Sequence, residues 1–185
     1  MQQFEVIKGI TLAMARTLEK QLREACGREI PVRFRYSDVK GECLTLCHVG
    51  VVRRSGNVDR EYELKGGAEQ FRNPPLLLRA QYFVSAWAEP PEDQALLGAV
   101  LRTFLDRPAL ELEGEDEEDM IAYAGIPEVN LDTVSLEEHR DLAQGFGMPF
   151  APSVAYCVDF RLQSGKVTPI KRVKERVMDF RKIEG

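Results

Sequence analysis

Residues 73–108 read NPPLLLRAQYFVSAWAEPPEDQALLGAVLRTFLDRP, and this stretch decides the fold. From Leu76 to Ala86 every even-numbered position is apolar, whereas polar side chains occur only at odd-numbered positions. A period of two with one wholly apolar face predicts a β-strand that buries that face. At about 3.3 Å per residue, a strand from Leu76 to Trp87 is roughly 40 Å long, well above the usual length. We therefore expect this strand to cross the whole domain.

Prolines mark both ends of the strand. Asn73-Pro74-Pro75 precedes it and Pro90-Pro91 follows it. Proline cannot donate a hydrogen bond to a sheet ladder, so the strand should begin and end between these prolines.

An amphipathic helix is predicted next, ending at Pro108, because two carboxylates occupy its first turn and apolar residues recur at helical spacing. The apolar positions are Leu96, Leu97, Val100, Leu101, Phe104 and Leu105. We expect the core to form between the even face of the strand and the helix face of Leu97, Leu101 and Phe104.

The residues before this stretch predict one helix and two or three strands. Helical spacing of apolar residues runs over residues 4–26 and stops at Gly27. Residues 30–36 alternate after a proline and predict a short strand at a sheet edge. Residues 44–52 predict a second strand, and residues 58–64 are interpreted as its returning hairpin arm.

The residues after Pro108 begin with a dense acidic run, residues 111–119. Such a run is typical of a solvated loop, and it lacks the alternation and the glycine of a calcium-binding loop. Residues 129–134 predict a short strand, and a capping-box pattern opens a helix over residues 135–144. From Ser153 to Leu162 the alternation of the central strand returns, so we expect these two long strands to share one core.

Composition bounds the class of protein. The chain has 185 residues, 44% of them hydrophobic, and a net charge of -5. The length and composition predict a single domain. Together with the strands and helices predicted above, they indicate an α+β fold with a twisted, mostly antiparallel sheet of long central strands flanked by helices. The negative charge argues against a nucleic-acid partner and against direct contact with an anionic membrane. No apolar run is long enough for a membrane helix and no signal-peptide pattern opens the chain, so a cytoplasmic location is expected.

Residues that could support chemistry are few. In a reducing cytosol the four cysteines are expected to be thiols that act as small core hydrophobes; they are Cys26, Cys43, Cys47 and Cys157. Cys43, Cys47 and His48 resemble metal ligands, but neighbours on a strand point to opposite faces and the two thiols would lie about 13 Å apart. His139 is expected on the surface, and Glu117 with Glu118 shows no apolar pocket that would separate their pKa values. We predict no catalytic residue, no metal and no cofactor.

The C-terminal residues 166–185 are basic on an acidic protein and are interpreted as an arm following a domain of residues 1–165. Apolar residues spaced among the charges predict that this arm docks on a partner, as a helix or as an extended strand. The candidate partner-binding residues are Ile170, Arg172, Val173, Lys174, Arg176, Val177 and Phe180.

Three motifs together resemble the cap, or tail-terminator, proteins of contractile injection systems. They are the proline-led strand that ends in Ser85-Ala86-Trp87-Ala88, the helix that contains Leu96-Leu97-Gly98, and the late strand that begins at Ser153. A helix before the first strand and another before Ser153 extend the resemblance over nearly the whole chain. The acidic run of residues 111–119 departs from the family pattern.

The resemblance implies a non-enzymatic subunit of a hexameric ring. Such a ring would close the end of a phage-tail-like particle inside a prokaryotic cell, in contact with the terminal sheath and inner-tube layers. A stand-alone cytosolic adaptor or a baseplate-associated binding module is the alternative interpretation, and ring closure would separate the two.

Overall fold

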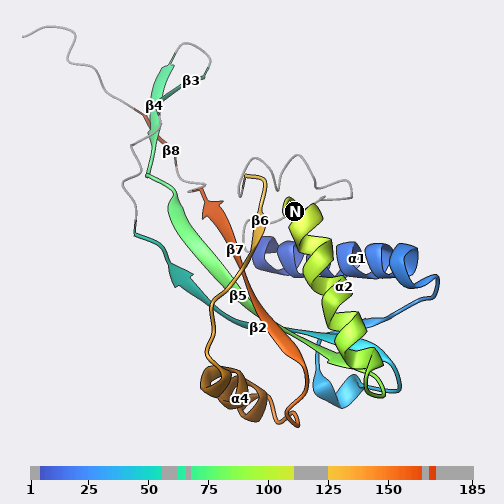
Figure 1. Ribbon diagram of the computed structural model, residues 1–185. Helices are drawn as coiled ribbons and strands as arrows, with labels where there is room; N and C mark the ends of the chain where they lie inside the picture. The colour runs from blue at the N-terminus through green and yellow to red at the C-terminus, as the bar shows by residue number, and fades with distance from the viewer. Residues whose placement is uncertain (1–4, 56–61, 66–67, 111–124, 164–166, 170–185) are drawn as a thin grey trace, which may run out of the picture. The chain divides into compact units, whose positions relative to one another are not determined.

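The computed structural model describes residues 5–55, 62–65, 68–110, 125–163 and 167–169 (Figure 1). The chain divides into two compact units, residues 1–57 with 75–163, and residues 58–74 with 164–185. Among the described residues, the larger unit carries three α-helices, the short helix η2 (Tyr36–Asp38) and five strands.

A five-stranded sheet in the order β1-β2-β5-β7-β6 forms the centre of the larger unit. The strands are β1 (Val32–Arg33), β2 (Cys43–Arg53), β5 (Leu76–Trp87), β6 (Glu128–Leu131) and β7 (Ser153–Leu162). Only β1 and β2 run parallel, and the other three neighbouring pairs are antiparallel. The sheet is therefore mostly antiparallel with two long central strands, β5 and β7, which confirms the predicted fold class.

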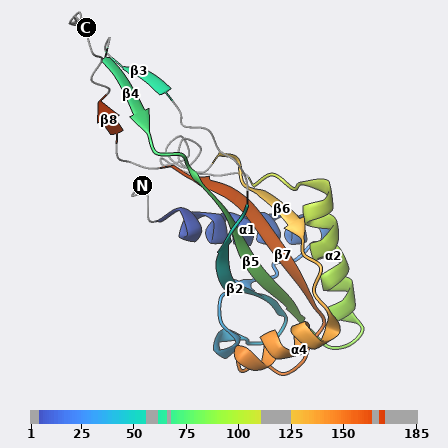
Figure 2. The ribbon, with the colours of Figure 1, turned by 90° about the vertical axis from the view of Figure 1, so that its left-hand side faces the viewer.

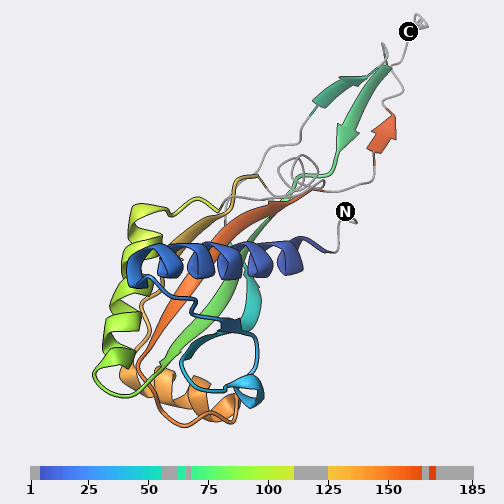
Figure 3. The same ribbon diagram turned by 90° about the vertical axis from the view of Figure 1, so that its right-hand side faces the viewer.

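Two helices, α1 (Val6–Cys26) and α2 (Glu92–Asp106), cover one face of this sheet (Figure 3). The even positions from Ala80 to Ala86 in β5 and from Val154 to Phe160 in β7 are buried beneath them, as predicted, with Ala80 opposite Val158 and Val84 opposite Val154. The start of β5 differs from the prediction, because Leu76 is 46% exposed. Helix α1 ends where expected, because Gly27 takes a left-handed conformation with φ of 68° and its N–H donates to the carbonyl of Arg23.

A pair of tyrosines on the core face connects the sheet to both helices. Tyr82 of β5 lies directly opposite Tyr156 of β7. The hydroxyl of Tyr82 lies 3.0 Å from the hydroxyl of Thr11 on α1, and the hydroxyl of Tyr156 donates to the carbonyl of Val100 on α2 at 3.5 Å. Burial raises the pKa of Tyr82 to about 12, so both hydroxyls stay neutral and keep their hydrogen bonds.

The face of α2 that enters the core differs from the predicted one. Leu96, Val100 and Phe104 are buried, whereas Leu101 and Leu105 are 40% and 80% exposed. The buried residues are four apart and lie in line along the helix, and each exposed leucine follows one of them by about 100° of rotation. The apolar stripe is thus wider than the surface that the sheet can cover, and the expected core role of Leu101 is wrong.

Within the described residues, the opposite face of the sheet is covered at one end only. There the short helix η2 (Tyr36–Asp38) and helix α4 (Leu136–Gly145) surround a second cluster (Figure 2). This cluster is built on Cys47, Phe83, Ala143 and Met148. The capping box at Ser135 is confirmed, because its side chain accepts from the N–H of Glu138 and the Glu138 carboxylate accepts from the N–H of Ser135.

His139 corrects another expectation. It is half-buried rather than on the surface, with its ring edge-on to Phe83 and the ring centres 5.4 Å apart. Periodicity could not show this contact, because Phe83 lies on the mainly polar side of β5 and needs an apolar cover of its own.

The smaller unit contains a three-stranded antiparallel sheet in the order β3-β4-β8. Its strands are β3 (Tyr62–Lys65), β4 (Ala68–Arg72) and β8 (Val167–Pro169). The predicted hairpin arm is corrected here, because β3 pairs with β4, a strand that the sequence did not predict, rather than with β2. The strand expected over residues 30–36 is only two residues long, and β6 ends at Leu131.

Two identical substitutions on α2 test this packing. Leu96→Ala should lower the free energy of unfolding by about 2–5 kcal/mol, because it empties a buried site. Leu105→Ala should change it by less than about 0.5 kcal/mol, since Leu105 is 80% exposed. Urea unfolding at low protein concentration, which limits association between copies, measures both. Equal losses in the two variants would contradict the assigned helix face.

Candidate interaction surface

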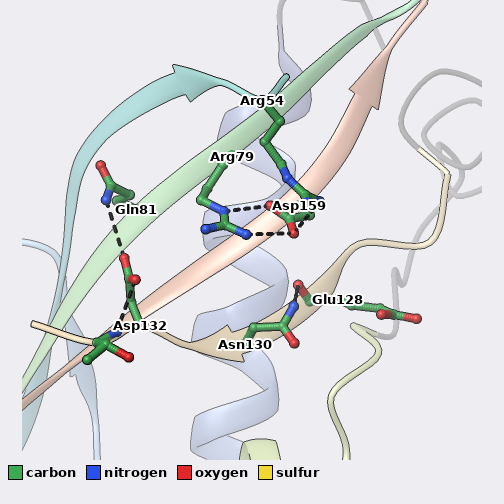
Figure 4. Close-up of polar contacts among 8 residues, drawn as sticks. Arg54, Arg79, Gln81, Glu128, Asn130, Asp132 and Asp159 are labelled. Atoms are coloured by element: carbon green, nitrogen blue, oxygen red, sulfur yellow. Dashed lines mark hydrogen bonds and ion pairs between the residues drawn. The ribbon is translucent and has the colours of Figure 1, made fainter. Parts of the chain in front are cut away.

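The uncovered end of the second sheet face carries a network of charged side chains (Figure 4). Arg79 on β5 lies directly opposite Asp159 on β7, and Arg54 follows the end of β2. The odd positions of β5 and β7 project to this face because side chains alternate along a strand. The bulge in β2 places Val52 opposite Arg79, so the even positions of β2 beyond the bulge project to the same face. The strand register therefore brings together three charges that are 25 to 105 residues apart in the sequence.

Asp159 accepts hydrogen bonds from both arginines. The Nε and Nη2 atoms of Arg79 lie 2.8 and 3.1 Å from its two carboxylate oxygens, and Nη1 of Arg54 lies 2.7 Å from Oδ2. The hydrogen bond to Asp159 raises the pKa of Arg79 above its ordinary value, so the guanidinium is always charged. With both oxygens engaged, the carboxylate joins β2, β5 and β7.

A second carboxylate, Asp132, follows the end of β6. Its Oδ2 accepts from Nε2 of Gln81 at 3.3 Å, and its Oδ1 accepts from the N–H of Thr133 at 3.1 Å. Its own N–H donates to the carbonyl of Ala155. Between the two carboxylates lies Cys157, whose thiol pKa is raised by burial, which keeps the sulfur protonated. These contacts fix Asp132 at the mouth of a neighbouring groove.

This groove, which we call the α4 groove, separates α4 from the open face of the sheet and has a volume of about 560 Å³. Its apolar lining includes Val49, Leu142 and Phe146, and Val49 lies at a β-bulge where the pairing of β2 with β5 shifts by one residue. Its charged lining is entirely acidic and consists of Asp132, Glu138 and Asp141. The α4 groove can therefore accept a chain segment that is both apolar and basic.

The cysteine and histidine residues that were considered as metal ligands do not line the α4 groove. Cys47 is buried in the second cluster beside Phe83, whereas His48 lies on the core side of the strand, with its ring 5.3 Å from that of Tyr82. The predicted separation of Cys47 from His48 is confirmed. In the ranges that the structure describes, no group of three His, Cys, Asp or Glu residues could hold a metal ion.

Several predicted residues lie outside the described residues. They are the acidic residues 111–119 with Glu117 and Glu118, and the arm residues Ile170, Arg172, Val173, Lys174, Arg176, Val177 and Phe180. Within the described part of the chain, no helix is long and apolar enough to cross a membrane.

Sequence reasoning did not single out Arg54, Arg79 or Asp159 as a group. The alternation placed Arg79 and Asp159 on the polar sides of two strands expected to share a core. Their contact depends on the register of β5 with β7, and alternation leaves registers that differ by two residues equally possible.

Comparison with known proteins gives a family match over most of the chain. Residues 10–173 match the model of the Pvc16 N-terminal domain. A search of curated proteins gave no match to the sequence.

Two solved structures share the fold. One is the PVC sheath/tube terminator in its extended state, from an extracellular contractile injection system, with a TM-score of 0.66 and 14% identity. The other is the tube-terminating cap of the anti-feeding prophage, with a TM-score of 0.63 and 16% identity. The matches cover 96% and 92% of this chain but only 65% and 60% of the two solved chains.

The two arginines on Asp159 should contribute unequally to stability. Arg79→Gln should lower the free energy of unfolding by about 1–2 kcal/mol, because it removes a two-pronged ion pair that is largely shielded from water. Arg54→Gln should cost less than about 0.5 kcal/mol, since Arg54 makes one bond and is half exposed. Urea unfolding at two salt concentrations compares them, and an equal or reversed order would contradict the network described.

Proposed function

The chain belongs to the Pvc16 N-terminal domain family, and we propose that it is a structural ring subunit that caps the end of a contractile injection system. The family match over residues 10–173 is the observation that carries this proposal. The shared fold with a sheath/tube terminator and with a tube-terminating cap supports it.

The proposal includes a closed ring of six copies that contacts the terminal sheath and inner-tube layers without catalysing a reaction. Assembly takes place in the cytoplasm of a prokaryotic cell. The charged network supports a structural role, because Asp159 is engaged by two guanidinium groups and holds three strands together rather than facing a substrate. The alternative, a cytosolic adaptor, would bind one partner without closing a ring.

Ring formation can be measured directly. Native mass spectrometry of the purified protein, alone and with sheath and tube subunits, should give one closed stoichiometry of six copies. In cells that lack the protein, electron microscopy should show particles without a terminal cap and with irregular length. A protein that stays monomeric in both mixtures, with particles of normal length in the deletion strain, would contradict the proposal.

The basic C-terminal arm is part of this proposal. It docks on an adjoining cap or sheath subunit through the apolar residues Ile170, Val173, Val177 and Phe180, assisted by Arg172, Lys174 and Arg176. Exposed charge pairs contribute only about 0–1 kcal/mol each and are screened by salt, so the apolar residues should contribute more of the affinity.

A truncation tests the arm. The cut belongs after Pro169 rather than at residue 165, because β8 (Val167–Pro169) pairs with β4. The chain of residues 1–169 should unfold at the same urea concentration as the full chain and should fail to cap particles. Changing only Arg172, Lys174 and Arg176 to Gln should weaken capping and reduce its salt dependence. Normal capping by the truncated chain would contradict a docking role for the arm.

A further inference from the structure

We propose that the α4 groove is the receptor for the basic C-terminal arm, residues 170–185, of a neighbouring copy of this chain. The inference rests on the proposed ring function and names the surfaces that join adjacent subunits. It is argued from the lining of the groove and from the composition of the arm.

The groove offers an apolar surface that the described part of the chain leaves partly exposed. Phe146, at the end of α4, and Val49, at the bulge of β2, remain 37% and 38% exposed. Leu142 also lines the groove and packs against the second cluster, so the apolar lining is continuous with a core. Exposed apolar surface rimmed by charge is typical of a protein interaction site.

The rim of the groove is negative and is fixed in place. Asp132 is held by Gln81 and Thr133, and Glu138 is held by the capping box of α4. Two hydrogen bonds from Ser135 lower the pKa of Glu138, and the one from the backbone N–H has a larger effect than the one from the side-chain hydroxyl. This carboxylate therefore stays ionised. With Asp141 the lining carries three carboxylates and no basic side chain.

The arm has the complementary composition. Residues 170–185 read IKRVKERVMDFRKIEG, with six basic and three acidic side chains, which gives a net charge of +3. Apolar residues are interspersed among the charges and include Ile170, Val173, Val177 and Phe180. The groove therefore matches the arm in both charge and apolar character. Sixteen residues span at most about 55 Å when extended, which is enough to reach across to another subunit.

Ring geometry favours the arm of another copy over the chain's own arm. A closed ring with cyclic symmetry is built from heterologous contacts, in which each subunit presents one surface to one neighbour and a different surface to the other. An arm and a groove on the same chain are such a pair. When every arm enters the next groove, no arm and no groove remains unpaired.

A synthetic peptide of residues 170–185 tests the receptor directly. It should bind the truncated chain of residues 1–169, which retains every described strand and helix, with a stoichiometry of one. Phe146→Gln in the truncated chain should weaken this binding at least tenfold. Phe150→Gln is the matched control, because Phe150 is 61% exposed and does not line the groove. Equal binding by the two variants would overturn the assignment of the groove.

Two variants on α4 test whether the carboxylates of the groove contribute to peptide binding. Asp141→Asn should weaken peptide binding two- to fivefold and reduce its salt dependence, because it removes one rim carboxylate. Glu137→Gln should have no effect, since Glu137 lies on the same helix outside the groove lining. A peptide with Val173, Val177 and Phe180 changed to Ser should bind more weakly than one with Arg172, Lys174 and Arg176 changed to Gln. If the peptide with the changed basic residues bound more weakly, the proposal that the arm binds through an apolar groove would be overturned.

Mixing two defective chains distinguishes a neighbour's arm from the chain's own arm. The truncated chain keeps its groove, and the full-length Phe146→Gln chain keeps its arm. Each should fail to form rings alone, and an equimolar mixture should give heterodimers by native mass spectrometry. A groove filled by its own arm predicts no heterodimer, and that result would overturn the inference.

The two proposals fail in different ways. Rings and normal capping by the Phe146→Gln chain would overturn the arm-and-groove contact and leave the capping function intact. Peptide binding and heterodimers without capping by the parent chain would support the contact and overturn the capping function.

Discussion

The antiparallel register between β5 and β7 is the constraint on which the rest of the larger unit depends. It sets Tyr82 opposite Tyr156 on one face and Arg79 opposite Asp159 on the other. A slip of one residue would turn one whole strand over and move charged side chains into the core, where an unpaired charge is very costly. The ion pair and the two tyrosine hydrogen bonds thus favour the same register from opposite faces of the sheet.

This register also gives the two faces of the sheet different surroundings. The core face receives α1 and α2 and provides most of the buried apolar surface. In the described residues, the other face is apolar at the end where η2 and α4 cover it and mainly polar around Arg79 and Asp159. The α4 groove forms where the covered part of this face meets the open part, so apolar and acidic side chains share one surface.

The fold can be shared by chains whose surface side chains differ. The fold resembles two terminator structures at only 14% and 16% identity. At that distance the alternation that builds the sheet can be retained while the exposed side chains change, because core positions need only apolar character and suitable volume. Surface contacts such as the α4 groove must therefore be argued from this chain's own residues.

Local patterns in the sequence were sufficient for elements whose signal lies within a few residues. The period-two runs of β5 and β7, the glycine that ends α1 and the capping box at Ser135 belong to this group, because each depends on neighbours along the chain. Tertiary structure decided the rest. It chose which side of α2 is buried, it covered Phe83 with His139, it paired β3 with β4, and it brought Arg54 and Arg79 to Asp159. These outcomes depend on contacts between segments far apart in the sequence, and a periodic pattern records that a face is apolar without recording what will cover it.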